Sequence, residues 1–160
     1  MFKEQDGTKA AAQIQAFEDT WEWDNRAAAS YDDVVNAGGP VANALEAFKR
    51  LLGGTPMLAY VSMMAPRLVE LKRVLRPTGS IYLHCDTTAS AHLRLLMDAV
   101  FGQRNFRNEI IWYYYNKMHD RRKRLFSRAT DTLLEAAAQN DGMDFVPHNL
   151  VIVTLRRAIR

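Results

Sequence analysis

The chain has 160 residues, of which 48% are hydrophobic and 24% charged, and its formal net charge is +3. This length allows one domain with a substantial core and is too short for two ordinary domains. No run approaches the roughly 18 apolar residues of a membrane-spanning helix, and the polar start "MFKEQDGTKAAAQ" has no apolar signal-peptide core, which indicates a cytoplasmic protein.

The first half of the chain predicts three helices. "DNRAAASYDDVVNAGG" indicates a helix over about 24–37, because Asp24 can cap its start and the two glycines end it. "PVANALEAFKRLLGG" follows with a proline in its first turn. A third helix, over about 56–75, has apolar residues close to a 3.6-residue period and opens with Thr55 and Pro56.

The second half alternates strand and helix. "SIYLHC" predicts a buried strand at about 79–85, and "NEIIWYYY" predicts a second strand at about 108–115. Between them lies a helix at about 88–101, for which Thr88 or Ser90 can serve as the cap. Because this connection is long enough for a parallel crossover, the order predicts an α/β fold with a mostly parallel sheet flanked by helices.

Polar residues gather where the first strand runs into this helix, in "HCDTTAS". Such junctions are where α/β folds usually bind ligands, so His84 and Asp86 are candidates for lining a cleft. The alternative is that Asp86, Thr88 and Ser90 only cap the helix. Capping accounts well for Thr88 and Ser90, and both interpretations stay open for His84 and Asp86.

No complete catalytic or metal-binding constellation is present in the sequence. It has no phosphate-binding Gly-rich loop, no nucleophile elbow and no closely spaced pair of histidines. The single cysteine excludes an internal disulfide, and its place in an apolar strand indicates that Cys85 is a core thiol. We therefore expect no metal site.

Charge is distributed unevenly along the chain. Residues 1–60 hold five Lys/Arg against nine Asp/Glu, whereas residues 104–128 hold eight against two, a net charge of +6. In "IIWYYYNKMHDRRKRLFSR" the cations are interleaved with aromatic residues, which suits nucleic acid because cations bind phosphates and aromatic rings stack on exposed bases. The candidate DNA-binding cations are Lys117, Arg121, Arg122, Lys123, Arg124 and Arg128.

Five stretches carry a family resemblance: "EQDGTKAAAQIQAFEDTWEWD", "MLAYVSMMAPRLVELKRVLRPTGSIYLHCD", "TASAHLRLLMDAVFG", "NFRNEIIW" and "NKMHDRRKRLFSRATDTLL". In this order they resemble the amino-group DNA methyltransferases of restriction-modification systems, above all the adenine-directed enzymes. These enzymes methylate the exocyclic nitrogen of adenine or cytosine with S-adenosylmethionine. The resemblance covers roughly residues 2–134 and implies a partial Rossmann-like methyltransferase domain.

The chain departs from the family's pattern at two functional motifs. The catalytic signature, Asp-Pro-Pro followed by Tyr or Phe, is absent, and so is the Gly-rich cofactor loop. After Leu134 the likeness stops abruptly, as a frameshift would make it, and we expect a poorly packed, divergent tail over 135–160. The resulting interpretation is a partial domain over 1–134, composed of a helical part (1–75), a strand–helix–strand part (79–115) and a basic segment (116–128).

The resemblance also implies roles for individual residues. His84 and Asp86 would line the cleft that holds the cofactor and the flipped-out base, and Trp112 or Tyr113 would stack on that base. The basic run would bind backbone phosphates. No catalytic residue is assigned, because the catalytic motif is absent.

With both motifs missing, we expect the isolated chain neither to transfer methyl groups nor to bind S-adenosylmethionine. The expected partners are DNA and, among proteins, a restriction subunit or the missing portions of the methyltransferase. Two other interpretations stay open. The chain would be a non-catalytic nucleic-acid-binding remnant in one and a non-functional truncated product in the other.

Overall fold

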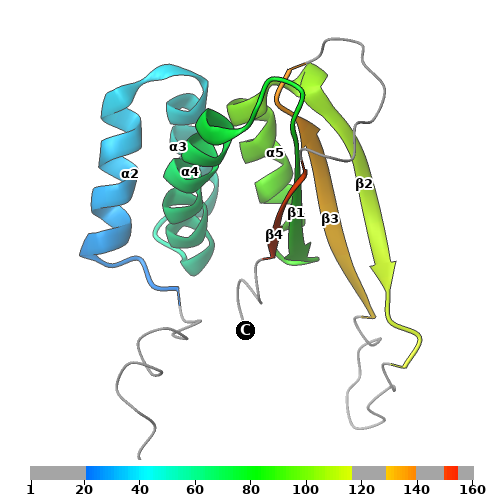
Figure 1. The fold of residues 1–160 in the computed structure, drawn as a ribbon. Helices are drawn as coiled ribbons and strands as arrows, with labels where there is room; N and C mark the ends of the chain where they lie inside the picture. The colour runs from blue at the N-terminus through cyan, green and yellow to red at the C-terminus, as the bar shows by residue number, and fades with distance from the viewer. Residues whose placement is uncertain (1–20, 117–128, 140–149, 155–160) are drawn as a thin grey trace, which may run out of the picture.

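The computed structural model describes residues 21–116, 129–139 and 150–154, which form a layer of helices against a β-sheet (Figure 1). The described α-helices all lie on one side of the sheet. In chain order the elements are α2 (Asn25–Ala37), α3 (Gly39–Leu52), α4 (Pro56–Val74), β1 (Ser80–Asp86), α5 (Ser90–Phe101), the 3-10 helix η1 (Gln103–Asn105), β2 (Phe106–Tyr113), β3 (Thr130–Ala137) and β4 (Leu150–Thr154). The predicted α/β class is therefore confirmed, as is each of the helices and strands predicted above.

Local hydrogen bonds explain where the first helices begin and end. The Ala27 N–H donates to Asp24 Oδ1 at 2.8 Å, which caps α2 as predicted. The Leu58 N–H donates to Thr55 Oγ1 at 3.4 Å at the start of α4. Gly38 has a φ of 74°, a conformation that other residues rarely adopt, and it separates α2 from α3.

The core lies between the helical layer and the sheet. Along β1, alternate residues are buried against the helices, namely Ile81, Leu83 and Cys85. The helices contribute, among others, Leu45 of α3, Leu58 and Leu68 of α4, and Leu93 and Leu96 of α5. Cys85 is 1% exposed, and burial raises the pKa of its thiol to about 12, so it is a core thiol as expected. In the described part of the chain, no helix has the length and apolarity that crossing a membrane requires.

The sheet is mixed and mostly antiparallel, so the prediction of a mostly parallel sheet is wrong for the described strands. The strand order is β2-β3-β1-β4. Strand β3 pairs antiparallel with both β1 and β2, whereas β4 pairs parallel with β1. The two predicted strands, β1 and β2, run in the same direction, as the crossover argument requires. They are not neighbours, because β3, which we did not predict, lies between them.

Strand β3 continues past residue 134, after which we expected a poorly packed tail. That expectation is wrong for residues 135–138. Ala136 is buried opposite β1, and the Ala138 N–H donates to the carbonyl of Gly79 at 2.8 Å. The reason is that "TDTLLEAA" places small or apolar residues at every second position, which lets β3 pack as an inner strand.

Candidate functional site

Asp86, the last residue of β1, orders the turn that leads into α5. Its Oδ1 accepts hydrogen bonds from the N–H groups of Thr88 at 3.0 Å and Ala89 at 3.1 Å. The N-cap position is occupied by Ala89, so neither Thr88 nor Ser90 takes the position that we expected for it. Both donors precede Ser90, the first residue of α5, so Asp86 orders the turn before the helix and no side chain caps the helix itself.

Asp131 of β3 joins side chains from the strands on both sides of it. Its Oδ2 lies 3.2 Å from Nε2 of His84 on β1, and the hydroxyl of Tyr114, the residue after β2, donates to the same oxygen at 2.8 Å. The side chains of His84 and Asp131 are 25% and 23% exposed. The bond to Asp131 favours the protonated phenol and raises the pKa of Tyr114. We call His84, Tyr114 and Asp131 the Asp131 cluster.

The strand register explains why these residues meet. Asp86 and Asp131 are Cα partners in the β1–β3 pair, and His84 lies two residues before Asp86. The three side chains therefore share the sheet face that points away from the helices. Sequence reasoning selected His84 and Asp86 but missed Asp131 and Tyr114. The alternation in "TDTLLEAA" was the signal that could have predicted β3 and, with it, the place of Asp131.

Strand β2 presents aromatic side chains to solvent. Trp112 and Tyr113 are 55% and 66% exposed and, as neighbours in a strand, point to opposite faces. Trp112 is the Cα partner of Asp131, which places the indole on the face of the Asp131 cluster. Core packing does not account for a tryptophan this exposed.

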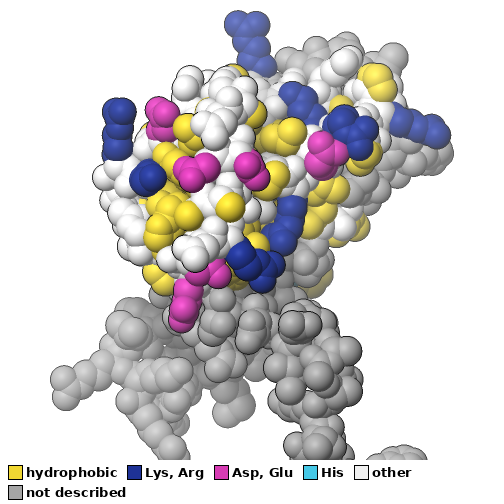
Figure 2. Space-filling model, turned by 90° about the vertical axis from the view of Figure 1, so that its left-hand side faces the viewer, with side chains coloured by type: hydrophobic (Ala, Val, Ile, Leu, Met, Phe, Trp, Pro, Cys, Tyr) yellow, Lys and Arg dark blue, Asp and Glu magenta, His cyan; other side chains and the backbone are white. Residues whose placement is uncertain are grey.

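The candidate DNA-binding cations, from Lys117 to Arg128, lie outside the described residues. The residues that flank them in the sequence are joined, because the Tyr114 N–H donates to the carbonyl of Ala129 at 2.7 Å. On the outer side of the helical layer, the described Lys/Arg and Asp/Glu side chains are interspersed among apolar ones (Figure 2). That face therefore does not offer a surface of one charge to a polyanion.

A sequence model of the family described as DNA methylase matches residues 49–151. The chain belongs to the DNA methylase family. The matched range runs from the end of α3 into β4 and contains every residue of the Asp131 cluster, together with Asp86, Trp112 and Tyr113.

Curated relatives of this DNA methylase include two subunits of restriction-modification enzymes and a type II methyltransferase. The chain is 34% identical over 68 residues to the Mod subunit of the type III restriction-modification enzyme StyLTI from Salmonella typhimurium, a match that covers 42% of this chain and 10% of the relative. It is 38% identical over 52 residues to the type II methyltransferase M.KpnI from Klebsiella pneumoniae, covering 32% and 12%. It is 27% identical over 73 residues to the EcoP15I Mod subunit from Escherichia coli, covering 42% and 11%. The match thus spans about a tenth of the length of each relative.

S-adenosylmethionine is the methyl donor of the enzymes that this chain resembles, and the described residues do not fit it. The Asp131 cluster and Asp86 already have hydrogen-bond partners within the protein. Among the described residues near this edge, Tyr60 has a buried hydroxyl without a hydrogen-bond partner, and burial, with Cys85 and Asp86 nearby, raises its pKa. The ring of Trp21 packs edge-on against Tyr60 at a centroid distance of 5.3 Å. One enclosed hydroxyl does not supply the several polar contacts of a nucleoside site.

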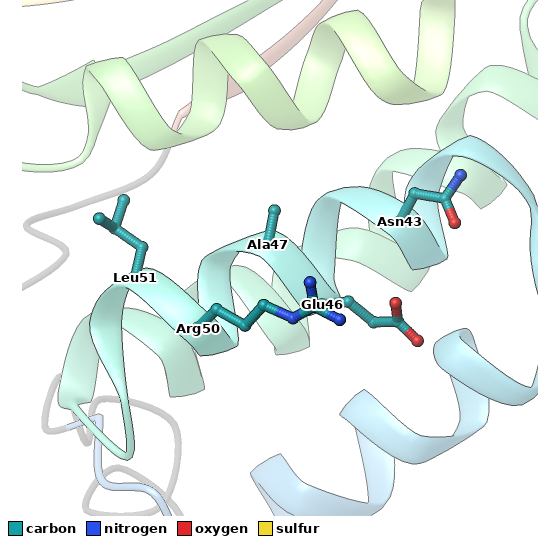
Figure 3. Close-up of a pocket in the computed structure, with 5 residues that line it drawn as sticks. All are labelled: Asn43, Glu46, Ala47, Arg50 and Leu51. Carbon is teal, nitrogen blue, oxygen red and sulfur yellow. The ribbon is translucent and has the colours of Figure 1, made fainter.

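A shallow depression of about 520 Å³ lies on α3, away from the Asp131 cluster. Its lining residues, shown in Figure 3, are Asn43, Glu46, Ala47, Arg50 and Leu51. All of them are exposed and come from one helix, with Ala47 and Leu51 pointing to the side of α5. An open surface of this kind does not enclose a ligand. Within the described ranges, no group of three or more His, Cys, Asp or Glu residues is placed to hold a metal ion.

Proposed function

We propose that this DNA methylase chain is part of a site-specific amino-group DNA methyltransferase of a restriction-modification system, directed to adenine, and that it retains DNA binding. The observation that carries the proposal is the family match over residues 49–151. The exposed aromatic end of β2, inside that range, supports it, because an aromatic surface open to solvent is available to a base.

Trp112 is our first candidate for the base-stacking residue. An enzyme that acts on a base within a duplex must extrude it, and the extruded base needs a new π-surface to replace its lost neighbours. Trp112 offers such a surface beside the Asp131 cluster, near the end of β1 where His84 and Asp86 lie. Tyr113 is the alternative on the opposite face of the strand.

Methyl transfer belongs to the completed enzyme and not to this chain alone. The sequence lacks the Asp-Pro-Pro signature and the Gly-rich cofactor loop, so we propose that S-adenosylmethionine is bound only in the completed enzyme. We infer that His84 and Asp86 line the edge of the substrate cleft, where Asp86 orders the turn before α5 and His84 is held by Asp131. Neither is assigned a chemical step.

The finer fold and the partners follow from the same proposal. We infer a partial Rossmann-like domain, for which the parallel β1–β4 pair and the β1–α5 junction are the supporting elements. Two of the relatives are named as Mod subunits of larger restriction-modification enzymes. We therefore propose that this chain acts with further protein, either a restriction subunit or the remaining portions of a methyltransferase.

A binding and transfer experiment tests the proposal. Fluorescence anisotropy of labelled duplexes measures binding by the purified chain at low and moderate salt. Tritiated S-adenosylmethionine measures methyl transfer to the same DNA. We expect salt-dependent DNA binding that is stronger for a duplex with a mismatched adenine, and no incorporation of label, because a mismatched base costs less to extrude.

Each outcome of that experiment separates the interpretations. Absence of DNA binding at low salt contradicts the proposal and favours a non-functional product. Binding without a preference for mismatched duplexes favours a non-catalytic nucleic-acid-binding remnant. Incorporation of methyl groups by the pure chain contradicts the inference that the missing motifs are required.

A further inference from the structure

Asp131 lies between the end of β2 and the end of β1. Its Oδ2 contacts a side chain at each end, namely Tyr114 after β2 and His84 on β1. We propose that Asp131 is a positioning residue that, through Tyr114 and His84, fixes the end of β2, and with it the exposed indole of Trp112, against β1. For its effect on DNA this inference rests on the proposed function. For its effect on Trp112 it rests on the geometry alone.

The end of β2 is held at two separate atoms of one residue. The Tyr114 hydroxyl donates to Asp131 Oδ2 at 2.8 Å, and the Tyr114 N–H donates to the carbonyl of Ala129 at 2.7 Å. The first bond fixes the ring and the second fixes the backbone. Asp131 Oδ2 also lies 3.2 Å from His84 Nε2 on β1, an inner strand of the described sheet. One oxygen therefore connects the sheet interior to the residue that follows β2.

Packing alone does not hold this part of β2. The strand is outermost in the described sheet and pairs with β3 alone, and its residues after Phe106 are all exposed. Strand ends with few buried contacts open at low free-energy cost. Hydrogen bonds to a carboxylate are stronger than bonds between neutral groups, so the Asp131 cluster supplies order where burial does not.

The choice of an acid at position 131 supports a role beyond strand stability. Asp131 and Asp86 are Cα partners, and like charges directly opposite each other destabilise a strand pair. The two carboxylates have different hydrogen-bond partners. Asp86 accepts from backbone N–H groups, and Asp131 contacts His84 of β1 and Tyr114, which follows β2. A cationic residue would pair better with Asp86 but has no acceptor for either bond, and a neutral amide could accept them only more weakly than a carboxylate does.

A fixed indole is the better stacking surface. Ordering a side chain on binding costs free energy, and a side chain that is already ordered avoids that cost. Trp112 is opposite Asp131 and two residues before Tyr114. Loosening Tyr114 should therefore increase the motion of the Trp112 side chain, which would remain exposed to solvent. The inference therefore predicts that the Asp131 cluster affects Trp112 before any DNA is present.

Fluorine NMR of the whole chain labelled with 5-fluorotryptophan tests this. The chain has three tryptophans, and Trp112→Phe assigns the resonance of interest. We expect Tyr114→Phe and Asp131→Asn to shift or broaden the Trp112 resonance and to leave those of Trp21 and Trp23 in place. Tyr113→Phe makes the same chemical change one residue away, outside the cluster, and should leave all three resonances in place.

Measuring DNA binding by the same variants distinguishes the proposed function from the positioning role of Asp131. Tyr114→Phe should reduce the preference for a mismatched over a matched duplex by about tenfold, the lower bound for one hydrogen bond to a charged group. A moved Trp112 resonance in a protein without any wild-type preference would contradict the proposed function and leave the positioning role supported. An unmoved resonance in both variants would overturn the positioning role whatever the DNA result. If Asp131→Asn moves all three resonances, the milder Tyr114→Phe decides.

Discussion

Trp112 and Asp131 lie directly opposite each other in the β2–β3 pair and differ sharply in exposure: the tryptophan is 55% exposed, whereas the carboxyl side chain is 23% exposed and hydrogen-bonded. An indole that stands in solvent on an outer strand adds little to the core. Large exposed aromatic groups beside ordered polar ones are typical of surfaces that bind a partner. We therefore expect that replacing Trp112 affects the stability of the fold little and affects DNA binding more.

Replacing Trp112 by alanine should change stability little. A fully buried aromatic residue costs about 3–5 kcal/mol when truncated, whereas we expect about 1 kcal/mol or less for Trp112 because surface substitutions are usually small in effect. Urea unfolding monitored by circular dichroism measures this. Phe101→Ala, at a buried position of α5, is the control that should show the large loss. A loss of similar size for both would mean that Trp112 is part of the core.

The same Trp112→Ala variant should lose DNA binding selectively. Because stacking on an extruded base is worth about 1–3 kcal/mol, the loss should be greatest for mismatched duplexes, in which extrusion is cheapest. Anisotropy titrations on matched and mismatched duplexes measure the difference. Equal weakening for both duplexes would argue against a stacking role, and Tyr113→Ala then tests the residue on the other face of β2.

Asp86→Ala should destabilise the protein more than Ser90→Ala. Asp86 accepts two backbone bonds in the turn before α5, whereas Ser90 donates one exposed bond to the carbonyl of Thr87 at 3.5 Å. Each such hydrogen bond contributes about 0.5–1.5 kcal/mol to stability, so losing two should cost more than losing one weak, exposed bond. The free energies of unfolding of the two variants in urea test the assignment. A larger loss of stability for Ser90→Ala would contradict this assignment and would support Ser90 as the helix cap, as the sequence predicts.

Alkaline pH should weaken the fold. Burial raises the pKa of Cys85 from 9.0 to about 12, and burial with a hydrogen bond to Glu135 raises that of Tyr82 from 10.0 to about 12. Between these limits the unfolded chain has released the protons that the folded chain still holds, so the unfolded state binds fewer protons. The free energy of unfolding should therefore fall as the pH rises from about 9 to about 12, with the full contribution present below about 9.

Unfolding in urea across that pH range measures the effect. Cys85→Ala should flatten the decline, because it removes one of the contributing groups, and Tyr82→Phe should flatten it as well. Identical declines in the wild type and in both variants would contradict the assignment of the raised pKa values to these residues.

Local signals in the sequence were sufficient for most of the elements. Asp24 and Thr55 cap α2 and α4 because their side chains bond backbone groups three residues away, and such short-range chemistry can be read directly. The short apolar, β-prone run around Leu83 likewise predicted β1. Cys85 followed as a core thiol for the same reason.

The candidate site was less predictable because it depends on a long-range pairing. His84 and Asp131 are 47 residues apart, and they meet only because β3 lies between β1 and β2. Sequence reasoning saw the polar junction at His84 and Asp86 but had no partner for His84 without β3. The same missing strand made the sheet look parallel. One unrecognised strand therefore accounts for both errors.

The basic run should control the salt dependence of DNA binding. Its six cations stand against Asp120 alone between Lys117 and Arg128. If about four of them contact phosphates, the logarithm of the affinity should fall with the logarithm of salt at a slope of roughly −3 to −4. Replacing Arg121, Arg122, Lys123 and Arg124 by alanine should flatten that slope and weaken binding to all sequences alike, because phosphate contacts position the protein on DNA but carry no sequence information.

Anisotropy titrations over a range of salt concentrations measure both effects, with Arg50→Ala, an exposed cation on α3, as the control. An unchanged slope in the fourfold variant would show that DNA contacts this protein elsewhere.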